Sequence, residues 1–193
     1  MTLHVLGISG SLRQGSYNSG LLRAASELLP EGMTIEIFDL SPIPMYNDDV
    51  RHSGYPDAVC ALRDRITAAD ALLIATPEYN ASIPGVLKNA IDWVSRPDKD
   101  GHLPMSMKPI AIMGAATGAF GATKALAHLR YVLVSTNSYT LNRPGVQVTY
   151  ADKKFDAEGN LTDEATRSQI HNLLLALAEF APRFAPAPAM SKP

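Results

Sequence analysis

Residues 7–18 read Gly-Ile-Ser-Gly-Ser-Leu-Arg-Gln-Gly-Ser-Tyr-Asn. The apolar run Leu3–Ile8 is typical of a buried strand, and a helical pattern starts where the quoted stretch ends. Glycines let the backbone approach a ligand closely, and a helix N-terminus offers unpaired N–H groups and a positive dipole end. Ser11, Arg13 and Ser16 add hydroxyl and guanidinium donors. The stretch therefore predicts a phosphate-binding turn between the first strand and the first helix.

The spacing of the glycines restricts the kind of phosphate ligand. No Gly-Lys-Ser/Thr follows them, as a Walker A loop requires, and Gly7 and Gly10 do not fit the dinucleotide pattern G-x-G-x-x-G. Asp39 could act as the ribose-binding acid of a dinucleotide fold, although it lies beyond the usual spacing of about 20 residues. A tight turn without a ligand is a further alternative. A terminal phosphate on a larger cofactor suits this loop best.

Apolar, β-branched runs alternate with helical patterns along the whole chain. Strands are expected at Leu3–Ser9, Thr34–Asp39, Ala71–Thr76, Pro109–Ala115 and Tyr139–Val148, the last interrupted at residues 142–145. Helices are expected at Asn18–Leu29, Pro56–Ala69, Pro84–Val94, Phe120–Val134 and Asp163–Phe184, with Asn18 capping the first and Thr162 or Asp163 the last. This alternation predicts an α/β fold, a doubly wound five-stranded parallel sheet with helices on both faces.

Composition sets limits on domain number and partners. The chain has 193 residues, and we expect one domain over residues 1–184 and a disordered tail over 185–193. A net charge of −2 argues against a basic nucleic-acid-binding surface, and no apolar run is long enough to span a membrane. The first residues lack the basic segment of a signal peptide. A single cysteine, Cys60, excludes an intramolecular disulfide and fits a reducing, cytoplasmic compartment.

Two further loops are expected beside the first. Thr76–Asn80 follows the third strand, and Gly114–Gly121 follows the fourth. Because the carboxyl ends of parallel strands meet at one edge, the three loops converge on one crevice. The amide of Asn80 can bond the edge of a flat ring, and Tyr79 offers an apolar face. One loop can thus hold a phosphate while the other two hold a ring.

The motifs together resemble a known family. Gly10–Asn18 looks like the GSxRxxSxN phosphate loop of the NADPH-dependent FMN reductases, and Pro77–Asn80, running on to Trp93, looks like that family's second hallmark. The resemblance extends to residue 163, nearly the whole chain. The family has a flavodoxin-like fold and includes quinone, chromate and azo reductases.

The resemblance implies a cofactor, a reaction and a set of site residues. Hydride would pass from NADPH or NADH to bound FMN and then to a quinone, azo, chromate or free-flavin acceptor. The phosphate would be held by Ser11, Arg13, Ser16, Tyr17 and Asn18, and the ring would be bordered by Pro77, Glu78, Tyr79 and Asn80. The family's habit also implies a homodimer or homotetramer. No side chain is singled out as catalytic, and the five scattered histidines lack metal-ligand spacing.

The third loop departs from the family pattern Ser-x-Gly-x-x-Gly-Gly. Ala116 stands where the serine is expected and Ala122 where the last glycine is expected, while Thr117 and Gly118 remain as candidate ring contacts. A non-catalytic electron carrier or flavin sensor would share the fold and the cofactor. Carriers are usually strongly acidic, which a net charge of −2 does not match. A dinucleotide-binding dehydrogenase is the third alternative.

Other residues are expected to serve structure. Cys60 lies in an apolar helical stretch and is expected in the core. Glu78 is expected to hold its loop or to pair across a subunit boundary rather than tune the flavin. Lys88 and Asp92, one helical turn apart, are expected to form a surface ion pair.

Overall fold

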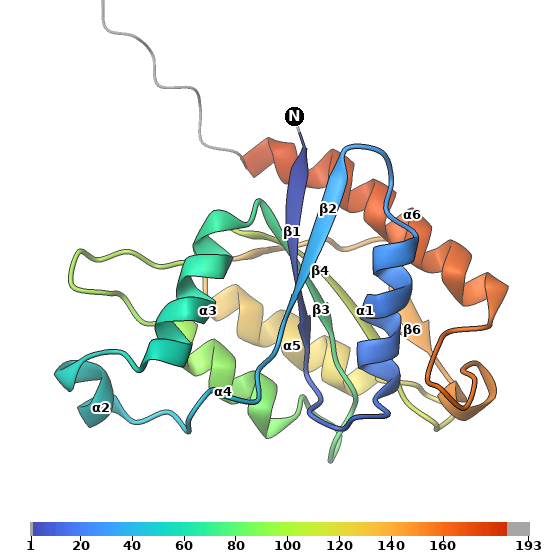
Figure 1. Cartoon of the computed structure of the whole chain (residues 1–193), viewed down its shortest axis with the longest axis horizontal. Coiled ribbons are helices and arrows are strands. Elements are labelled where there is room, and N and C mark those ends of the chain that lie inside the picture. The colour runs from blue at the N-terminus through green and yellow to red at the C-terminus, as the bar shows by residue number, and fades with distance from the viewer. Residues whose placement is uncertain (1, 185–193) are drawn as a thin grey trace, which may run out of the picture.

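A mixed-length parallel sheet forms the centre of the molecule. The computed structural model describes residues 2–184 (Figure 1). Its strands are β1 (Leu3–Ser9), β2 (Met33–Phe38), β3 (Ala71–Ala75), β4 (Pro109–Ala115), β5 (Tyr139–Thr140) and β6 (Val146–Val148). They lie in the order β2-β1-β3-β4-β5, all pairs are parallel, and β6 also pairs with β4. This is the flavodoxin-like strand order, and the predicted fold class is confirmed.

The fifth position of the sheet is shared by two short strands. β5 pairs with Pro109 and Ile110 at the start of β4, and β6 pairs with Met113–Ala115 at its end. The segment Asn142-Arg143-Pro144-Gly145 separates them, because proline cannot donate a ladder hydrogen bond. The predicted interruption of the last strand is therefore confirmed.

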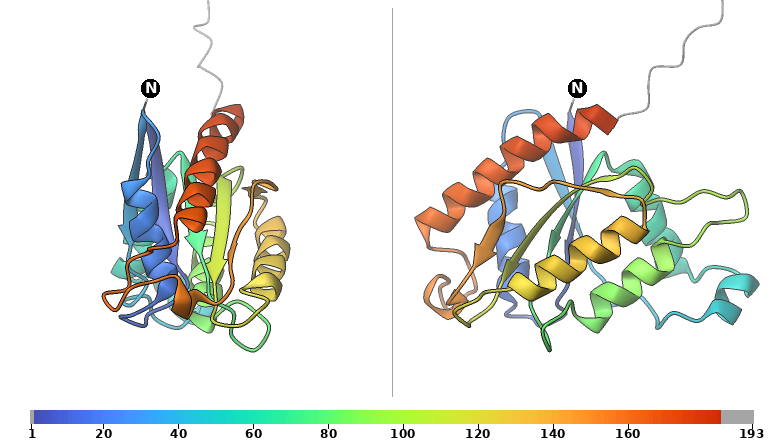
Figure 2. Two further views of the ribbon diagram at one scale, coloured as in Figure 1. Left: turned by 90° about the vertical axis from the view of Figure 1, so that its right-hand side faces the viewer. Right: turned by 180° about the vertical axis from the view of Figure 1, so that it is seen from behind.

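Helices cover both faces of the sheet. α1 (Tyr17–Glu27) and α6 (Glu164–Phe180) lie on one face, while α3 (Asp57–Ala68), α4 (Gly85–Val94) and α5 (Thr123–Ser135) lie on the other (Figure 2). A short helix, α2 (Asp48–Ser53), and two 3-10 turns, Ala151–Lys153 and Ala181–Phe184, complete the elements. Within residues 2–184, no helix is long and apolar enough to cross a bilayer.

The two cores follow from the alternation of side chains along the strands. In β3, Leu73 packs toward α1 and α6, whereas Leu72 and Ile74 pack toward α3, α4 and α5. All five residues of β3 are buried, as expected of a central strand covered on both sides. Trp93 of α4 is the largest fully buried side chain.

Three local expectations are corrected by the structure. α1 starts at Tyr17 and is capped by Ser16, whose side chain accepts from the N–H of Ser19, so Asn18 is not the cap. α2 lies between the strand expected at Thr34–Asp39 and the helix expected at Pro56–Ala69, where no helix was expected. Cys60 is exposed, because the buried stripe of α3 runs through Val59, Leu62, Arg63 and Ile66 and leaves residue 60 outside it.

Two other local predictions are confirmed. Asp163 caps α6, and Lys88 and Asp92 form an ion pair at 2.7 Å. The expected tail lies outside the described residues.

Candidate functional site

Three loops leave the sheet side by side. Ser9, at the end of β1, is in register with Ala75 of β3, which is in register with Met113 of β4. Hydrogen bonds continue past the strands, from the N–H of Gly10 to the carbonyl of Ala75 at 2.8 Å and from the N–H of Thr76 to that of Met113 at 3.0 Å. The loops after β1, β3 and β4 therefore open at the same edge, the lower edge in Figure 1.

The first loop is organised by serines. The hydroxyl of Ser9 accepts from the N–H of Ser11 at 3.3 Å and contacts the hydroxyl of Ser19 at 3.0 Å. The hydroxyl of Ser11 accepts from the N–H of Arg13 at 3.3 Å, and Ser16 donates its N–H to the carbonyl of Arg13 at 3.0 Å. Ser11 and Ser16 are both buried. The loop thus has a fixed shape that ends in the N-terminus of α1.

The electrostatics of this N-terminus fit a phosphate. The first turn of α1 contains no acidic residue, and Arg13 forms no ion pair with any carboxylate in residues 2–184. Its guanidinium lies 5.3 Å from the ring centre of Tyr17 and near Gly15. A guanidinium without an acidic partner beside the positive end of a helix attracts an anion. The predicted residues Ser11, Arg13, Ser16 and Tyr17 are therefore brought together.

Asn18 occupies the same helix turn but turns its side chain inward. Its amide nitrogen donates to the carbonyl of Ala115 at 3.0 Å, and its amide oxygen accepts from the N–H of Ala115 at 2.9 Å. The side chain is buried and joins α1 to the end of β4. Asn18 thus fixes the first loop relative to the third, and its main-chain N–H lies in the first turn of α1.

The second loop is a tight hairpin. Tyr79 and Ser82 exchange two main-chain hydrogen bonds of 3.0 Å. The turn residues Asn80 and Ala81 have φ angles of 50° and 60°, a left-handed conformation that is uncommon for alanine. Pro77 is buried at the base, whereas the ring of Tyr79 is 50% exposed. The hairpin therefore presents Tyr79 and Asn80 at the edge of the sheet.

Glu78 fastens this hairpin to α5. Its carboxylate accepts from the N–H of Lys124 at 2.8 Å and from that of Ala125 at 3.1 Å, in the first turn of the helix. The hydroxyl of Ser82 and Nδ1 of His128 form a second link at 3.0 Å. A carboxylate at a helix N-terminus pairs with N–H groups that have no intrahelical partner. The geometry agrees with the expected loop-holding role of Glu78.

The third loop is open at Thr117 and Gly118. Both residues are exposed, and a Cβ atom built on Gly118 would have no neighbour within 4 Å. The loop turns through a hydrogen bond from the N–H of Gly121 to the carbonyl of Gly118 at 3.1 Å. The departures at Ala116 and Ala122 leave this turn intact, so all three predicted loops reach the same edge.

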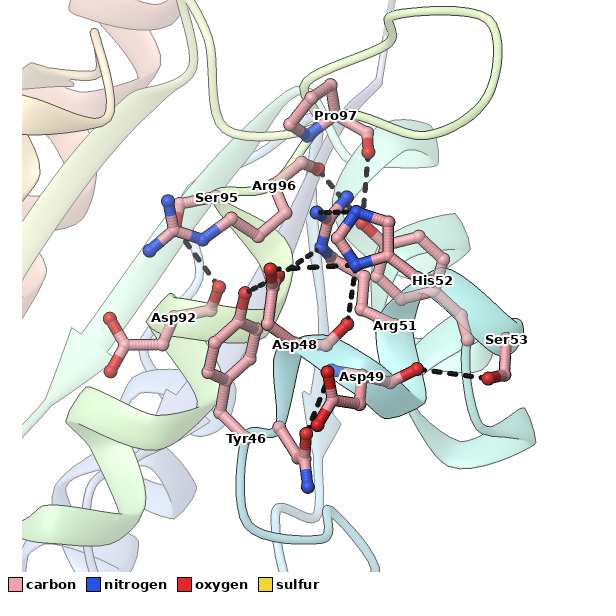
Figure 3. Close-up of polar contacts among 12 residues, drawn as sticks. Tyr46, Asp48, Asp49, Arg51, His52, Ser53, Asp92, Ser95, Arg96 and Pro97 are labelled. Atoms are coloured by element: carbon pink, nitrogen blue, oxygen red, sulfur yellow. Dashed lines mark hydrogen bonds and ion pairs between the residues drawn. The ribbon is translucent and has the colours of Figure 1, made fainter.

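A fourth segment, after β2, is fixed against α4. The carbonyl of Pro44 accepts from the indole of Trp93 at 2.8 Å and from the amide of Asn89 at 2.9 Å. Asp48 beyond it accepts from Tyr46 at 2.6 Å and from Arg51 at 2.7 Å (Figure 3). The hydrogen bonds from Arg51 and Tyr46 lower the pKa of Asp48 to about 2. The segment after β2 is therefore ordered, and it lies at the same edge of the sheet as the three loops.

Comparisons with known proteins agree with this geometry. The model of the NADPH-dependent FMN reductase family matches residues 3–153. The chain belongs to this family. It is 54% identical over 175 residues to an NAD(P)H-dependent FMN reductase of Pseudomonas aeruginosa, covering 91% of this chain and 93% of the relative. The comparison confirms the predicted family, and with it the prediction of an oxidoreductase that uses FMN and NAD(P)H.

Two further relatives extend the comparison. A quinone reductase of Escherichia coli is 37% identical over 185 residues, covering 94% of this chain and 96% of that protein. The solved structure of a flavoenzyme NAD(P)H:(acceptor) oxidoreductase from Paracoccus denitrificans matches with a TM-score of 0.84 and 32% identity, covering 95% of this chain and 99% of that one. This chain therefore shares its fold with that solved flavoenzyme over 95% of its length.

Several residues at the site were not predicted from the sequence. Ser9, Ser82 and His128 shape the loops through the hydrogen bonds above. Residues 149–162, here called the strap, lie against α1 and the third loop. The strap sequence Asp-Ala-Glu-Gly-Asn at 156–160 is typical of a turn and was the available signal. That turn pattern does not predict that the strap packs against α1.

Proposed function

We propose that this FMN-dependent NAD(P)H oxidoreductase binds its cofactor across the three loops and reduces a quinone. Ser11, Arg13, Ser16, Tyr17 and Asn18 would hold the phosphate, and Pro77, Glu78, Tyr79, Asn80, Thr117 and Gly118 would border the ring, in direct contact or by holding a loop. Bound FMN would supply the redox chemistry, with NADPH or NADH as the electron donor. The observation that carries the proposal is the position of Arg13 beside the α1 N-terminus, with no ion-pair partner among residues 2–184.

The chain's residues would act by position and polarity rather than by proton transfer. The serines and the α1 N-terminus would fix one end of the cofactor, and the hairpin that Glu78 fastens would fix the ring end. The positive end of α1 and the loop N–H groups would stabilise negative charge on the cofactor. No residue is assigned as an acid or base.

The edge itself favours a flat apolar acceptor. Each segment that follows a strand at this edge exposes at least one large apolar side chain, including Leu12, Met45, Tyr79, Phe120 and Tyr150. Such a rim suits the faces of an aromatic or quinone ring and offers little to a small inorganic anion. Relatives of this chain are named quinone reductases. A quinone is therefore the first acceptor to test, before azo compounds, chromate or free flavin.

Acceptor assays test this proposal. The FMN-loaded protein should oxidise NADPH or NADH steadily with 1,4-benzoquinone, and more slowly with chromate at equal concentration. Phe120→Ser, at an exposed residue outside the proposed ring contacts, should raise KM for the quinone and leave the rate of flavin bleaching by NADPH unchanged. Chromate turnover faster than that of every quinone would contradict the assignment. Flavin bleaching without turnover of any acceptor would favour the carrier or sensor.

We further propose that the protein is a homodimer or homotetramer and that it is located in the cytoplasm. A homodimer or homotetramer is supported by α5, where Tyr131 is 81% and Val134 is 75% exposed on one side of the helix. A cytoplasmic location is supported by the free, exposed thiol of Cys60, because such thiols persist in reducing compartments. Residues 1–184 would act as one FMN-binding domain.

A further inference from the structure

Three side chains form a line of stacked contacts from the strap to the first loop. The ring of Phe155 lies 5.0 Å from that of Tyr17, which lies 5.3 Å from the guanidinium carbon of Arg13. We propose that Phe155 is a positioning residue for the cofactor phosphate, holding Arg13 in its binding orientation through Tyr17. This inference rests on the proposed phosphate-binding role of Arg13.

The orientation of the Arg13 side chain depends on Tyr17, because the first loop itself makes few contacts with the guanidinium. The side chain is exposed, and it has no ion-pair partner in the described chain. A Cβ atom on Gly15 would lie 3.1 Å from Nη1, so the guanidinium lies close above this glycine and beside the Tyr17 ring. A cation prefers the face of an aromatic ring within about 6 Å. Tyr17 is therefore the aromatic surface that orients the guanidinium.

The ring of Tyr17 in turn packs against Phe155. Its ring packs at 46° to that of Phe155, which is buried in the core shared by α1 and α6. Tilted aromatic pairs at this separation have a preferred geometry that other apolar side chains do not impose. Replacement of Phe155 by an aliphatic residue would keep the core apolar and release the Tyr17 ring.

The strap that carries Phe155 is fastened at two places. On the α1 side, Arg23 donates to the carbonyl of Gly159 at 2.5 Å, and a Cβ atom on Gly20 would lie 2.6 Å from that oxygen. On the other side, Ala151 donates its N–H to the carbonyl of Ala116 in the third loop at 3.2 Å. Gly20 thus permits the close approach of the strap, and the segment that carries Phe155 is held between α1 and the third loop.

If Phe155 and Tyr17 preorganise the Arg13 guanidinium, the effect should appear as a difference between the affinities for FMN and for riboflavin. A guanidinium already oriented toward the phosphate loses less freedom on binding, which tightens binding of FMN. Riboflavin carries the same ring without the phosphate, so its affinity should not depend on Arg13 or Phe155. A change in general stability of the site would weaken both ligands alike. The ratio of the two dissociation constants therefore reports positioning separately from folding.

The test is a double-mutant cycle on cofactor-free protein titrated with FMN and with riboflavin by flavin fluorescence. Phe155→Leu should weaken FMN about threefold to tenfold, the size of an aromatic–cation contact, and leave riboflavin binding unchanged. In an Arg13→Ala background, Phe155→Leu should cause no further loss. Phe184→Leu is the matched control, because Phe184 stacks on Tyr139 at 4.2 Å, at the opposite edge of the sheet.

The outcomes separate this inference from the function it rests on. If Arg13→Ala leaves FMN affinity unchanged, the phosphate assignment of Arg13 fails first. If Arg13→Ala weakens FMN but Phe155→Leu has no effect, lowers both ligands equally, or adds its full loss in the Arg13→Ala background, the positioning role of Phe155 is wrong. Should Phe155→Leu not fold, Phe155→Met also removes the ring while keeping a long apolar side chain in the core, and its FMN-to-riboflavin ratio decides between the same outcomes.

Discussion

At the scale of single residues, Glu78 shows how one carboxylate can fasten a loop to the start of a neighbouring helix. Its carboxylate ends on the N–H groups of Lys124 and Ala125, so it connects the hairpin that carries Tyr79 with the start of α5. The connection depends on acceptor atoms and their position. The net charge of Glu78 is a separate property that substitution can isolate.

Two substitutions of Glu78 separate these properties. Glu78→Ala should lower the free energy of unfolding by about 0.5–2 kcal/mol, as for loss of a helix cap. Glu78→Gln keeps one acceptor oxygen, so it should recover most of this loss and leave the flavin reduction potential near that of the wild type. Asp92→Ala, which removes the ion pair with Lys88 on α4, is the control and should cost at most about 1 kcal/mol. Urea unfolding and potentiometry measure the effects, and a Glu78→Gln potential far from wild type would contradict a positional role.

The predictability of the site differs from residue to residue. Ser11, Arg13 and Ser16 lie within six positions of one another, so the local sequence was enough to place them at one helix N-terminus. The side-chain bonds of Asn18 reach Ala115, 97 positions away, and no local pattern reports such a contact. The side chain thus forms a structural link, and the predicted phosphate contact of Asn18 would be made by its main-chain N–H.

At the scale of elements, the beginning of α6 illustrates a helix fixed by its cap. Asp163 accepts from the N–H of Thr166 at 2.9 Å and from its hydroxyl at 2.5 Å. These bonds to Thr166 favour the ionised form and lower the pKa of Asp163 in the folded state. The stabilisation is therefore complete above the ordinary carboxyl pKa of about 3.9 and is lost as the pH falls through the lowered value.

Removing the carboxylate should flatten the acid limb of the stability profile. Asp163→Asn keeps a cap but cannot be protonated in this range, so its free energy of unfolding should fall less than that of the wild type below about pH 4. Urea unfolding at pH 6 and at pH 3.5 gives the comparison. Equal losses for both proteins would show that Asp163 is not part of the acid sensitivity.

Element boundaries were predicted where a physical signal marks them. β1 and β4 were placed to the residue, because apolar runs fill both faces of buried strands. α2 was missed because six residues within a proline-containing segment give too short a periodicity. The start of α1 was placed one residue late, since Ser16 and Asn18 are both good caps and only the fold decides between them.

At the scale of the whole molecule, α5 leaves an apolar surface uncovered. Tyr131 and Val134 are among its most exposed residues, on the helix that Glu78 and His128 connect to the hairpin. Exposed aromatic and aliphatic side chains on one helix are typical of a contact between copies. An assembly through α5 would thus lie next to the cofactor edge.

Light scattering tests this assembly. Tyr131→Glu places a charge in the proposed contact and should reduce the mass of the dimer or tetramer toward that of the monomer. Leu175→Glu, on α6 at the other face of the sheet, should leave the mass unchanged. A wild type that is monomeric at all concentrations, or a Tyr131→Glu variant of undiminished mass, would contradict the proposed contact.

The order of strands was the most predictable property of the whole molecule. Alternating elements restrict the chain to a parallel sheet, and the motifs at residues 10–18 and 77–80 selected the flavodoxin-like order. The packing of the strap against α1 depends on Gly20 and Gly159, which are far apart in sequence. Contacts of that kind need the folded structure.

The most direct test of the account is the visible absorption spectrum of the purified protein before and after anaerobic NADPH or NADH. The released cofactor is identified by chromatography. We predict an oxidised-flavin spectrum that bleaches on addition of the nucleotide, with FMN as the released molecule. Protein that shows no flavin, even after incubation with FMN, would contradict the central claim that the three loops form an FMN site.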